Sequence, residues 1–148
     1  RVLKEVDSLV PAYKVNRVIL CSGKVYFDLL EARREKSIDK VAIIRLEQLS
    51  PWPRANITRH LECYPNAEIV WCQEEPQNQG AWGYAAPRID SVLEGLSDTV
   101  RKLRYVGRPE AASPASGSFQ IHLSEQRLLV DEALAAPGVG GGSKGAQP

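Results

Sequence analysis

Apolar residues along the chain form two kinds of pattern. Three short continuous runs, rich in β-branched residues, begin at positions 17, 41 and 67 and read RVILC, VAIIRL and AEIVWC. Such runs are typical of strands buried on both faces of a parallel sheet. The segments 24–36 and 50–64 between them carry apolar residues at helical spacing. This alternation predicts strand–helix–strand units joined by right-handed crossovers.

The second half of the chain is less regular. A helix is predicted within residues 84–96, beginning near Pro87, because proline is tolerated in a first helical turn. The segment VRKLRYVG, residues 100–107, predicts a fourth strand, and residues 119–136 predict a final helix. The Pro-, Ser- and Ala-rich segment 108–118 predicts a connecting loop. These elements together indicate a small α/β domain.

The composition is typical of a soluble protein and argues against several classes of partner. Nineteen basic and eighteen acidic residues leave a net charge of +1 over 148 residues, so no nucleic-acid or anionic-membrane partner is expected. No apolar run approaches the roughly 20 residues that span a bilayer. Because the chain begins with Arg1 and contains no methionine, we interpret it as a segment of a longer polypeptide.

The cysteine pattern favours free thiols over a metal site. Cys21 and Cys72 lie in apolar runs, and the odd number of cysteines indicates buried thiols in a reducing compartment. His60 and Cys63 have the spacing H-x-x-C, but no second closely spaced ligand pair accompanies them. We therefore expect no metal site in this chain.

The turn CSGK, residues 21–24, follows the first buried strand and precedes a helix. Backbone N–H groups at such a turn bind anions, and Ser22 and Lys24 would add donors. The glycine patterns of dinucleotide and P-loop sites are absent. Capping of the helix by Ser22, with Gly23 permitting a sharp turn and Lys24 solvated, is therefore the favoured interpretation.

Two adjacent acids, Glu74 and Glu75, follow the third buried strand. This is the edge of an open α/β sheet at which function usually lies. Adjacent residues of an extended chain point to opposite sides, so the two acids do not form a ready acid–base pair. One of them would serve as a carboxylate across a subunit boundary, or both would charge the start of the next helix, and the residues alone leave both alternatives open.

Aromatic and basic residues beyond this edge suggest contact surfaces. Trp82 and Tyr84 lie among small residues and supply contact area of the kind found at interfaces. Arginines that flank the fourth strand, and serines of the loop after it, have the chemistry to bind phosphate, although such residues are more often solvated or simply connect elements. They are Arg101, Arg104, Arg108, Ser113, Ser116 and Ser118. No catalytic set is assembled.

Four blocks of the chain, read together, resemble one enzyme family. They are ILCSGKVYFDLLEARRE, VAIIRLEQLSPWP, NAEIVWCQEEPQNQGAWGYAAPRI and YVGRPEAASPASGS. They closely resemble, in the same order, the C-terminal part of the thiamin-diphosphate-dependent first component of the 2-oxoglutarate dehydrogenase complex. The resemblance runs from about Arg17 to Ala135. The segments RLEQLSPWP and WCQEEPQNQGAW carry most of its specificity.

The resemblance implies a fold for this chain and implies that catalysis takes place in other domains of the enzyme. The fold is a transketolase C-terminal-domain-like, three-layer α/β domain, with a mostly parallel sheet of about five strands and helices on both faces. The whole enzyme of this family oxidatively decarboxylates 2-oxoglutarate on thiamin diphosphate with magnesium, and succinylates the lipoyl group of the acyltransferase component. The cofactor lies between two preceding domains, and the G-D-G signature that accompanies it is absent here. We therefore expect no catalytic residue and no bound cofactor in this chain.

The resemblance also implies partners and boundaries. Residues 1–16 are expected to link a preceding domain, residues 17–136 to form the α/β domain, and residues 137–148 to form a disordered glycine-rich tail. The implied partners are the chain's own N-terminal and central domains, a homodimer partner, the acyltransferase component and dihydrolipoyl dehydrogenase. The family works in the mitochondrial matrix, which we favour, or in the bacterial cytoplasm.

Two groups of residues are the candidate sites. We expect the first group to hold neighbouring domains or the second subunit; it comprises Gln73, Glu74, Glu75, Asn78, Gln79 and Trp82. The second group is a candidate regulatory site for an anion or a nucleotide, formed by Ser22, Lys24, Arg45 and Arg108. The alternatives are the same domain of a related 2-oxoacid dehydrogenase acting on 2-oxoadipate, and a free-standing nucleotide- or anion-binding α/β module.

Overall fold

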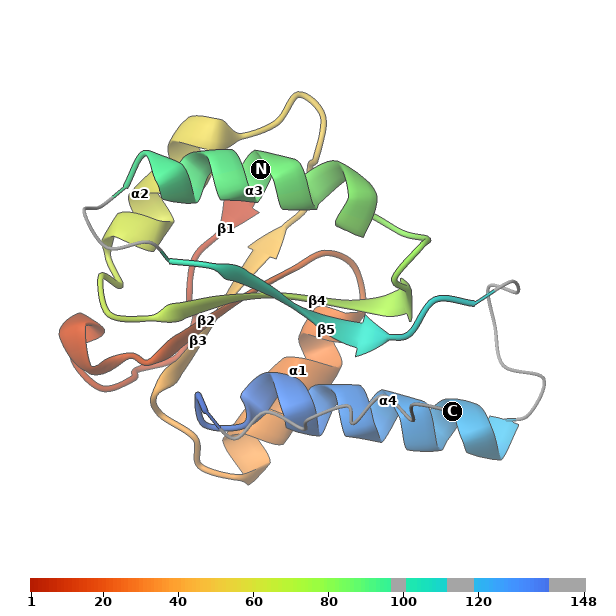
Figure 1. Cartoon of the computed structure of the whole chain (residues 1–148). Coiled ribbons are helices and arrows are strands. Elements are labelled where there is room, and N and C mark those ends of the chain that lie inside the picture. Colours follow the sequence, from red (N-terminus) through yellow and green to blue (C-terminus); the bar gives the residue numbers. More distant parts are fainter. Residues whose placement is uncertain (97–100, 112–118, 139–148) are drawn as a thin grey trace.

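A five-stranded sheet lies between two layers of helices in the computed structural model, which describes residues 1–96, 101–111 and 119–138. Figure 1 shows α2 and α3 on one side of the sheet and α1 and α4 on the other. The strands are β1 (Val2–Leu3), β2 (Arg17–Cys21), β3 (Val41–Leu46), β4 (Glu68–Pro76) and β5 (Leu103–Arg108). The helices are α1 (Val25–Glu35), α2 (Arg54–Glu62), α3 (Trp82–Glu94), α4 (Phe119–Leu134) and the short 3-10 helix η1 (Ala12–Lys14).

The strand order is β1-β3-β2-β4-β5, and only β1 is antiparallel to its neighbour. Arg17 at the start of β2 pairs with Val41 on β3 and with Glu68 on β4, so the three strands begin in register. The carboxyl ends of the four parallel strands therefore meet along one edge of the sheet. Polar residues that follow these strands lie together at this edge. In open α/β sheets, functional sites usually lie at the carboxyl ends of the strands.

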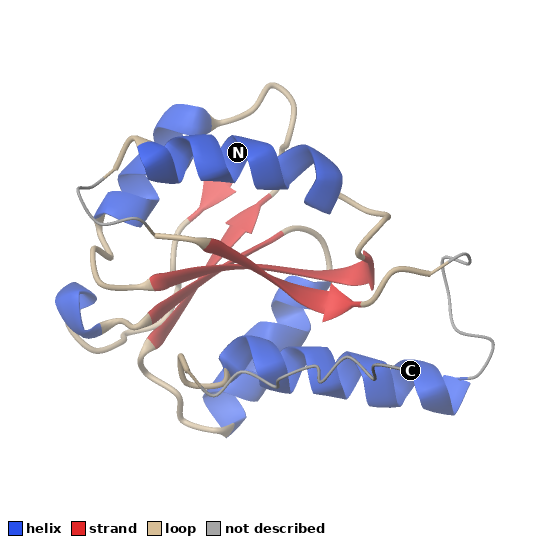
Figure 2. Ribbon diagram, viewed as in Figure 1, coloured by secondary structure: helices blue, strands red, loops and turns tan. Residues whose placement is uncertain are grey.

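Alternate residues of each strand enter two separate cores. One core, between the sheet and helices α2 and α3, contains Leu20, Ile44 and Trp71. The other core, between the sheet and helices α1 and α4, contains Ile19, Ile43 and Val70. Figure 2 shows the two helical layers enclosing the strands. Strands covered on both faces need apolar residues at every position, which is why the sequence shows continuous runs.

The predicted α/β fold with a mostly parallel sheet is confirmed. The helix expected near Pro87 begins earlier, at Trp82, and Pro87 lies inside it. Proline lacks the N–H that would bond the carbonyl of Gly83, four residues back. Both residues are exposed, so this part of the helix faces solvent, where a backbone carbonyl does not need a partner within the protein.

Residues 1–16, expected to be a linker, pack onto this domain. Val2 and Leu3 pair with β3, and Glu5 accepts a hydrogen bond from the backbone N–H of Ile43 at 2.7 Å. Most of the predicted glycine-rich tail and the loop serines 113, 116 and 118 lie outside the described residues. Among the helices that are described, none is both long and apolar enough to cross a membrane.

Candidate functional site

Gln73, at the carboxyl edge of the sheet, is the centre of a buried hydrogen-bond cluster. It is 2% exposed and lies on the same face of β4 as Trp71. Its Oε1 accepts hydrogen bonds from the indole Nε1 of Trp71 and the backbone N–H of Trp82, each at 3.0 Å. Its Nε2 donates to the carbonyl oxygens of Glu75, Pro76 and Gln79 at 3.2, 3.0 and 2.9 Å. The amide thus fixes the turn between β4 and α3 from inside.

Tyr105 and Gly107 of β5 enclose this cluster. The Tyr105 ring lies 5.1 Å from the Trp82 ring, and its hydroxyl donates to the carbonyl of Arg108 at 2.7 Å. Burial raises the pKa of this hydroxyl to about 12. A Cβ on Gly107 would lie 2.7 Å from the carbonyl oxygen of Gln73, so only glycine fits there. The aromatic pair and the glycine together hold β5 against the end of β4.

Glu74 and Glu75 both belong to β4, which continues to Pro76. The alternative in which they charge the start of the next helix is therefore wrong, because α3 has Ala81 as its N-cap and no acid in its first turn. Glu74 accepts a hydrogen bond from the Gln126 side chain at 2.8 Å. Glu75 is exposed on the opposite face. The pair thus points to opposite sides, as predicted for adjacent residues of a strand.

Arg108 is held by acceptors on α4. Its side chain is 9% exposed, and its Nε lies 3.0 Å from a carboxylate oxygen of Glu125. Its Nη2 donates to Oε1 of Gln126 at 3.2 Å, and Gln126 in turn donates to Asp28 of α1 at 2.9 Å. Gln126 therefore connects α1, α4, β4 and β5, a role that its position in a polar stretch of sequence did not indicate.

The other residues of the expected anion site lie at neighbouring strand ends. Arg45 at the end of β3 is paired in register with Cys21, which directly precedes Ser22. Its guanidinium lies over the rings of Tyr26 and Phe27, 5.3 and 5.0 Å from their centroids. Register thus brings Ser22, Lys24 and Arg45 to adjacent positions at the ends of β2 and β3. Arg108 lies on β5, two positions from β2 and three from β3 in the sheet.

The turn between β2 and α1 corrects one prediction. Ser22 does not cap α1, because Lys24 is the N-cap and no side chain caps the helix. Gly23 has φ of +81°, as expected of the sharp turn. The Lys24 side chain is 80% exposed and lies 3.9 Å from Glu74, so it is solvated as predicted. The helix begins later than predicted because the chain makes its turn at Gly23, so the first helical residue is Val25.

The amide side chains after β4 bind the segment that follows β5. Asn78 Nδ2 donates to the carbonyl of Ala111 at 2.9 Å, and the Ala111 N–H donates back to Asn78 Oδ1 at 3.1 Å. Gln79 Nε2 donates to the same carbonyl at 3.4 Å. Arg101 and Arg104 are likewise engaged inside the domain, by the carbonyl of Tyr64 and the carboxylate of Glu132.

The described residues do not fit a thiamin diphosphate and magnesium site. They contain no group of three or more His, Cys, Asp or Glu side chains with metal-binding geometry. At the carboxyl edge of the sheet, the adjacent acids Glu74 and Glu75 of β4 point to opposite faces, so they cannot bind one ion together. Magnesium bound to a diphosphate needs carboxylate or carbonyl oxygens that remain available to it. No reaction step is therefore assigned to these residues.

Comparisons with known proteins find related sequences and a related fold. A family model described as "2-oxoglutarate dehydrogenase C-terminal" matches residues 1–134. The chain is 46% identical over 121 residues to the 2-oxoglutarate dehydrogenase E1 components of Brucella anthropi, Brucella ovis and Brucella canis. The match covers 82% of this chain and 12% of each relative, so the chain spans only a small part of their length.

The fold also resembles that of a solved structure described as "Split gene transketolase, inactive beta4 tetramer". The TM-score is 0.59 at 17% sequence identity, and the match covers 90% of this chain and 42% of that one. This likeness shows the fold alone, and it confirms the expected transketolase-like architecture. The family match over residues 1–134 and the identity of 46% to the Brucella proteins show the family: the chain belongs to the 2-oxoglutarate dehydrogenase C-terminal family.

Proposed function

We propose that the chain is the C-terminal domain of a 2-oxoglutarate dehydrogenase E1 component and that its role there is structural. The observation that carries this proposal is the buried cluster around Gln73, whose amide is fully used by five hydrogen bonds inside the domain. A catalytic edge would present polar groups to a substrate. At this edge, the polar atoms of Gln73 instead hydrogen-bond to the turn between β4 and α3. Such bonds make the edge rigid, which suits a supporting surface.

The activity of the parent protein is inferred from its relatives. A 2-oxoglutarate dehydrogenase E1 component would oxidatively decarboxylate 2-oxoglutarate on thiamin diphosphate with magnesium, and would succinylate the lipoyl group of the acyltransferase component. Dihydrolipoyl dehydrogenase would be the third enzyme of that complex. The identity of 46% to relatives of that name supports this activity for the parent protein, of which the chain would be an inert part.

The surface offered to other domains or to a second subunit would be the outer side of this edge. Glu75 and Asn78 are exposed there, and Trp82 is half-buried. Gln73, Glu74 and Gln79 are bonded internally and would support that surface from behind. The domain would thus stabilise a homodimer through a shape fixed by its own hydrogen bonds.

The experiment is to compare the full-length parent protein with the same protein lacking the segment that begins at Arg1. Thiamin-dependent decarboxylation of 2-oxoglutarate and the mass in solution are measured for both. We expect an active dimer for the parent, and loss of both activity and dimer for the truncation. An active, dimeric truncation would overturn the structural role, while activity on 2-oxoadipate alone would favour the paralogous enzyme.

Two substitutions test the surface itself within the full-length parent. Trp82→Ala and Glu75→Ala are expected to weaken the dimer. The matched control is Glu62→Ala, an exposed acid at the end of α2. If all three variants dimerise alike, this edge does not contact the second subunit.

A regulatory anion site is the second candidate function. Arg45 favours it, because its Nε is buried with no hydrogen-bond partner among the described residues, near the turn that holds Ser22 and Lys24. Arg108 is a weaker member of the group, since Glu125 and Gln126 already bind it. Titration with phosphate, followed by NMR shifts of these four residues, tests the site. No shift at Ser22, Lys24 or Arg45 would remove it, and with it the free-standing anion-binding alternative.

The compartment of the protein follows that of its parent. The relatives named above are bacterial, which favours the bacterial cytoplasm over the mitochondrial matrix that the resemblance alone had favoured. The buried thiols of Cys21 and Cys72 fit a reducing compartment of either kind. Fractionation of cells that produce the parent protein would decide between them.

A further inference from the structure

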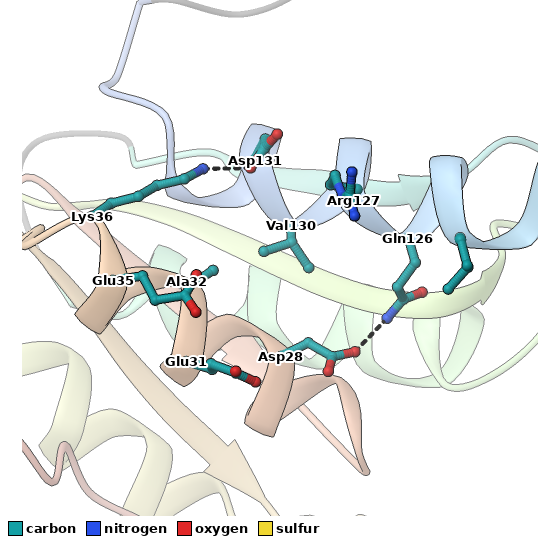
Figure 3. Close-up of a pocket in the computed structure, with 10 residues that line it drawn as sticks. Asp28, Glu31, Ala32, Glu35, Lys36, Gln126, Arg127, Val130 and Asp131 are labelled. Carbon is teal, nitrogen blue, oxygen red and sulfur yellow. Dashed lines mark hydrogen bonds and ion pairs between the residues drawn. The ribbon is translucent and has the colours of Figure 1, made fainter.

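A groove runs between α1 and α4 on the outside of the second helical layer. Figure 3 shows its two walls, with the α1 side chains facing those of α4. Its volume is about 630 Å³, within the usual range of binding clefts. Ala32 and Val130 face each other across it. The groove is therefore large enough to receive side chains of another molecule.

Polar pairs join the two helices at the ends of this groove. Lys36 of α1 forms an ion pair with Asp131 of α4 near one end. Gln126 of α4 donates a hydrogen bond to Asp28 of α1 at 2.9 Å near the other end. These contacts join the two helices at both ends of the groove. The groove therefore has a defined contact between the helices at each end, and it is open between them.

Its middle is acidic. Glu31 and Glu35 are exposed and one helical turn apart on α1, and neither has an ion-pair or hydrogen-bond partner within the described part of the chain. Since Lys36 and Asp131 neutralise each other, the remaining wall carries the carboxylates of Asp28, Glu31 and Glu35 against the single cation Arg127. A partner with positive charge is the one that this wall attracts.

An exposed apolar stripe leads into the groove from the start of α4. Phe119 and Leu123 lie one turn apart and are 72% and 43% exposed. Leu123 lines the groove, and the same stripe continues to Val130, which is buried against the domain. The stripe therefore extends beyond the part of the helix that the domain itself covers. Exposed apolar residues beside a groove mark an interaction surface.

We propose that the groove between α1 and α4 is the docking surface for a basic amphipathic helix of a partner protein. An apolar stripe on that helix would lie along Leu123 and Ala32. Lysines or arginines one turn apart would face Glu31 and Glu35, which have the same spacing. The acidic wall disfavours an anionic membrane or a nucleic acid as the occupant. The surface would serve the parent protein whatever 2-oxoacid that protein uses.

The test measures binding of a synthetic helical peptide that carries a leucine stripe flanked by lysines one turn apart. A second peptide replaces the lysines with glutamates, and a third has the first composition in scrambled order. Fluorescence anisotropy is measured with the 148-residue chain and with the full-length parent. We expect the lysine peptide to bind both proteins more tightly than the other two peptides, with affinity falling as salt is added.

Charge reversal in the groove provides the sharper measurement. The double variant Glu31→Lys and Glu35→Lys should lower the affinity for the lysine peptide by about tenfold and should raise the affinity for the glutamate peptide. The matched control reverses Glu62 and Glu94, exposed acids on helices α2 and α3 of the other layer, and should leave binding unchanged. Leu123→Ser should lower the affinity for the lysine peptide, but this variant should still prefer the lysine peptide to the glutamate peptide. Circular dichroism checks that each variant is folded.

Several outcomes would overturn the proposal. Equal binding of the lysine and glutamate peptides would show that the acidic wall does not select the partner. Equal binding of the lysine and scrambled peptides, or equal effects of the groove and control reversals, would show that only general charge attraction is present. Binding to the 148-residue chain but not to the parent would assign the groove to another domain of the same protein. Self-association abolished by the Glu31 and Glu35 reversal would assign it to a second copy. Preference for anionic vesicles over the lysine peptide would assign it to a membrane.

Discussion

Arg33 of α1 and Glu5 of the N-terminal segment form a doubly hydrogen-bonded ion pair, with Nη2 2.6 Å from Oε1 and Nη1 2.7 Å from Oε2. Their side chains are only 1% and 9% exposed. Arg33 Nη1 also donates to the carbonyl of Val41 at 2.9 Å, while Glu5 accepts from the N–H of Ile43. One buried pair therefore joins the N-terminal segment, α1 and β3.

Removing one partner of this pair should be strongly destabilising. Arg33→Met would leave the Glu5 carboxylate buried without its counter-charge, and the expected loss of unfolding free energy is about 3–5 kcal/mol. Urea unfolding followed by circular dichroism measures it. The control is Arg34→Gln, because Arg34 is 57% exposed and pairs only with Asp7 in the described residues. Similar unfolding midpoints for the two variants would contradict the role assigned to the buried pair.

The same cluster should make the protein less stable in acid. Burial by itself would raise the pKa of Glu5, but hydrogen bonds from Arg33 and from the Ile43 N–H lower it below its usual value. Hydrogen bonds from Arg34 and Arg33 hold the pKa of Asp7 well below its usual range. The unfolded chain therefore binds protons first as the pH falls, which favours unfolding.

The expected profile is a free energy of unfolding that is steady near neutral pH and falls below about pH 4, where unfolded carboxylates become protonated. Urea midpoints measured between neutral and acid pH give this profile. Glu5→Gln removes one titrating group and should make the fall shallower. A Glu5→Gln profile parallel to that of the unchanged protein would count against this origin of the acid sensitivity.

The sequence predicted the sheet better than the contacts that fasten it. Runs such as VAIIRL identify β3 because a strand covered on both faces has no other pattern. Glu5 looks like an ordinary surface acid in the sequence, and its partner Arg33 lies 28 positions away, so local reasoning had no signal for the packing of residues 1–16. The continuity of β4 to Pro76 was also hidden, because Glu74 and Glu75 suggested the end of a strand.

The sequence indicated a polar cluster after the third buried strand, but it did not indicate the direction in which each side chain of that cluster points. Gln73 was expected to contact a neighbouring domain, yet it faces inward beside Trp71. Strand periodicity contains this signal, since residues 71 and 73 share a face. Gln126 could not be found in the same way, because its contacts to Asp28 and Glu74 depend on how α4 packs across three elements.

The three cysteines should differ sharply in reactivity. Burial raises the pKa of the Cys21 thiol to about 12, despite the nearby charge of Arg45, and it also raises the pKa of Cys72. Cys63 is exposed. Because the thiolate is the reactive form, a thiol reagent at neutral pH should titrate Cys63 alone in the folded protein and all three cysteines after unfolding. Rapid reaction of a Cys63→Ser variant in the folded state would show that the sheet opens.

Gln73→Leu should cost more than the loss of any exposed amide in the same segment. The leucine would leave the indole N–H of Trp71, the N–H of Trp82 and several carbonyls without partners. The expected loss is about 2–4 kcal/mol, since unsatisfied buried groups cost about 1–3 kcal/mol each and the surface turn can admit water to some of them. Thermal unfolding measures this, and Asn78→Ala, which removes bonds at an exposed position, is the control. Equal losses would contradict the central position of Gln73.

Substitution of two glycines by alanine should change stability in opposite directions. A Cβ at Gly107 would lie 2.7 Å from the backbone oxygen of Gln73 and would also meet the Tyr105 ring, so Gly107→Ala must displace β5 from β4 and should cost about 1–3 kcal/mol. Gly83, in the first turn of α3, has no atom within 4 Å of the added carbon. Gly83→Ala should therefore stabilise the protein by about 0.5–1 kcal/mol, because alanine loses less backbone entropy in a helix. Urea unfolding of both variants measures the two effects. A Gly107→Ala variant as stable as the unchanged protein would show that β4 and β5 are not held at the close approach seen at Gln73.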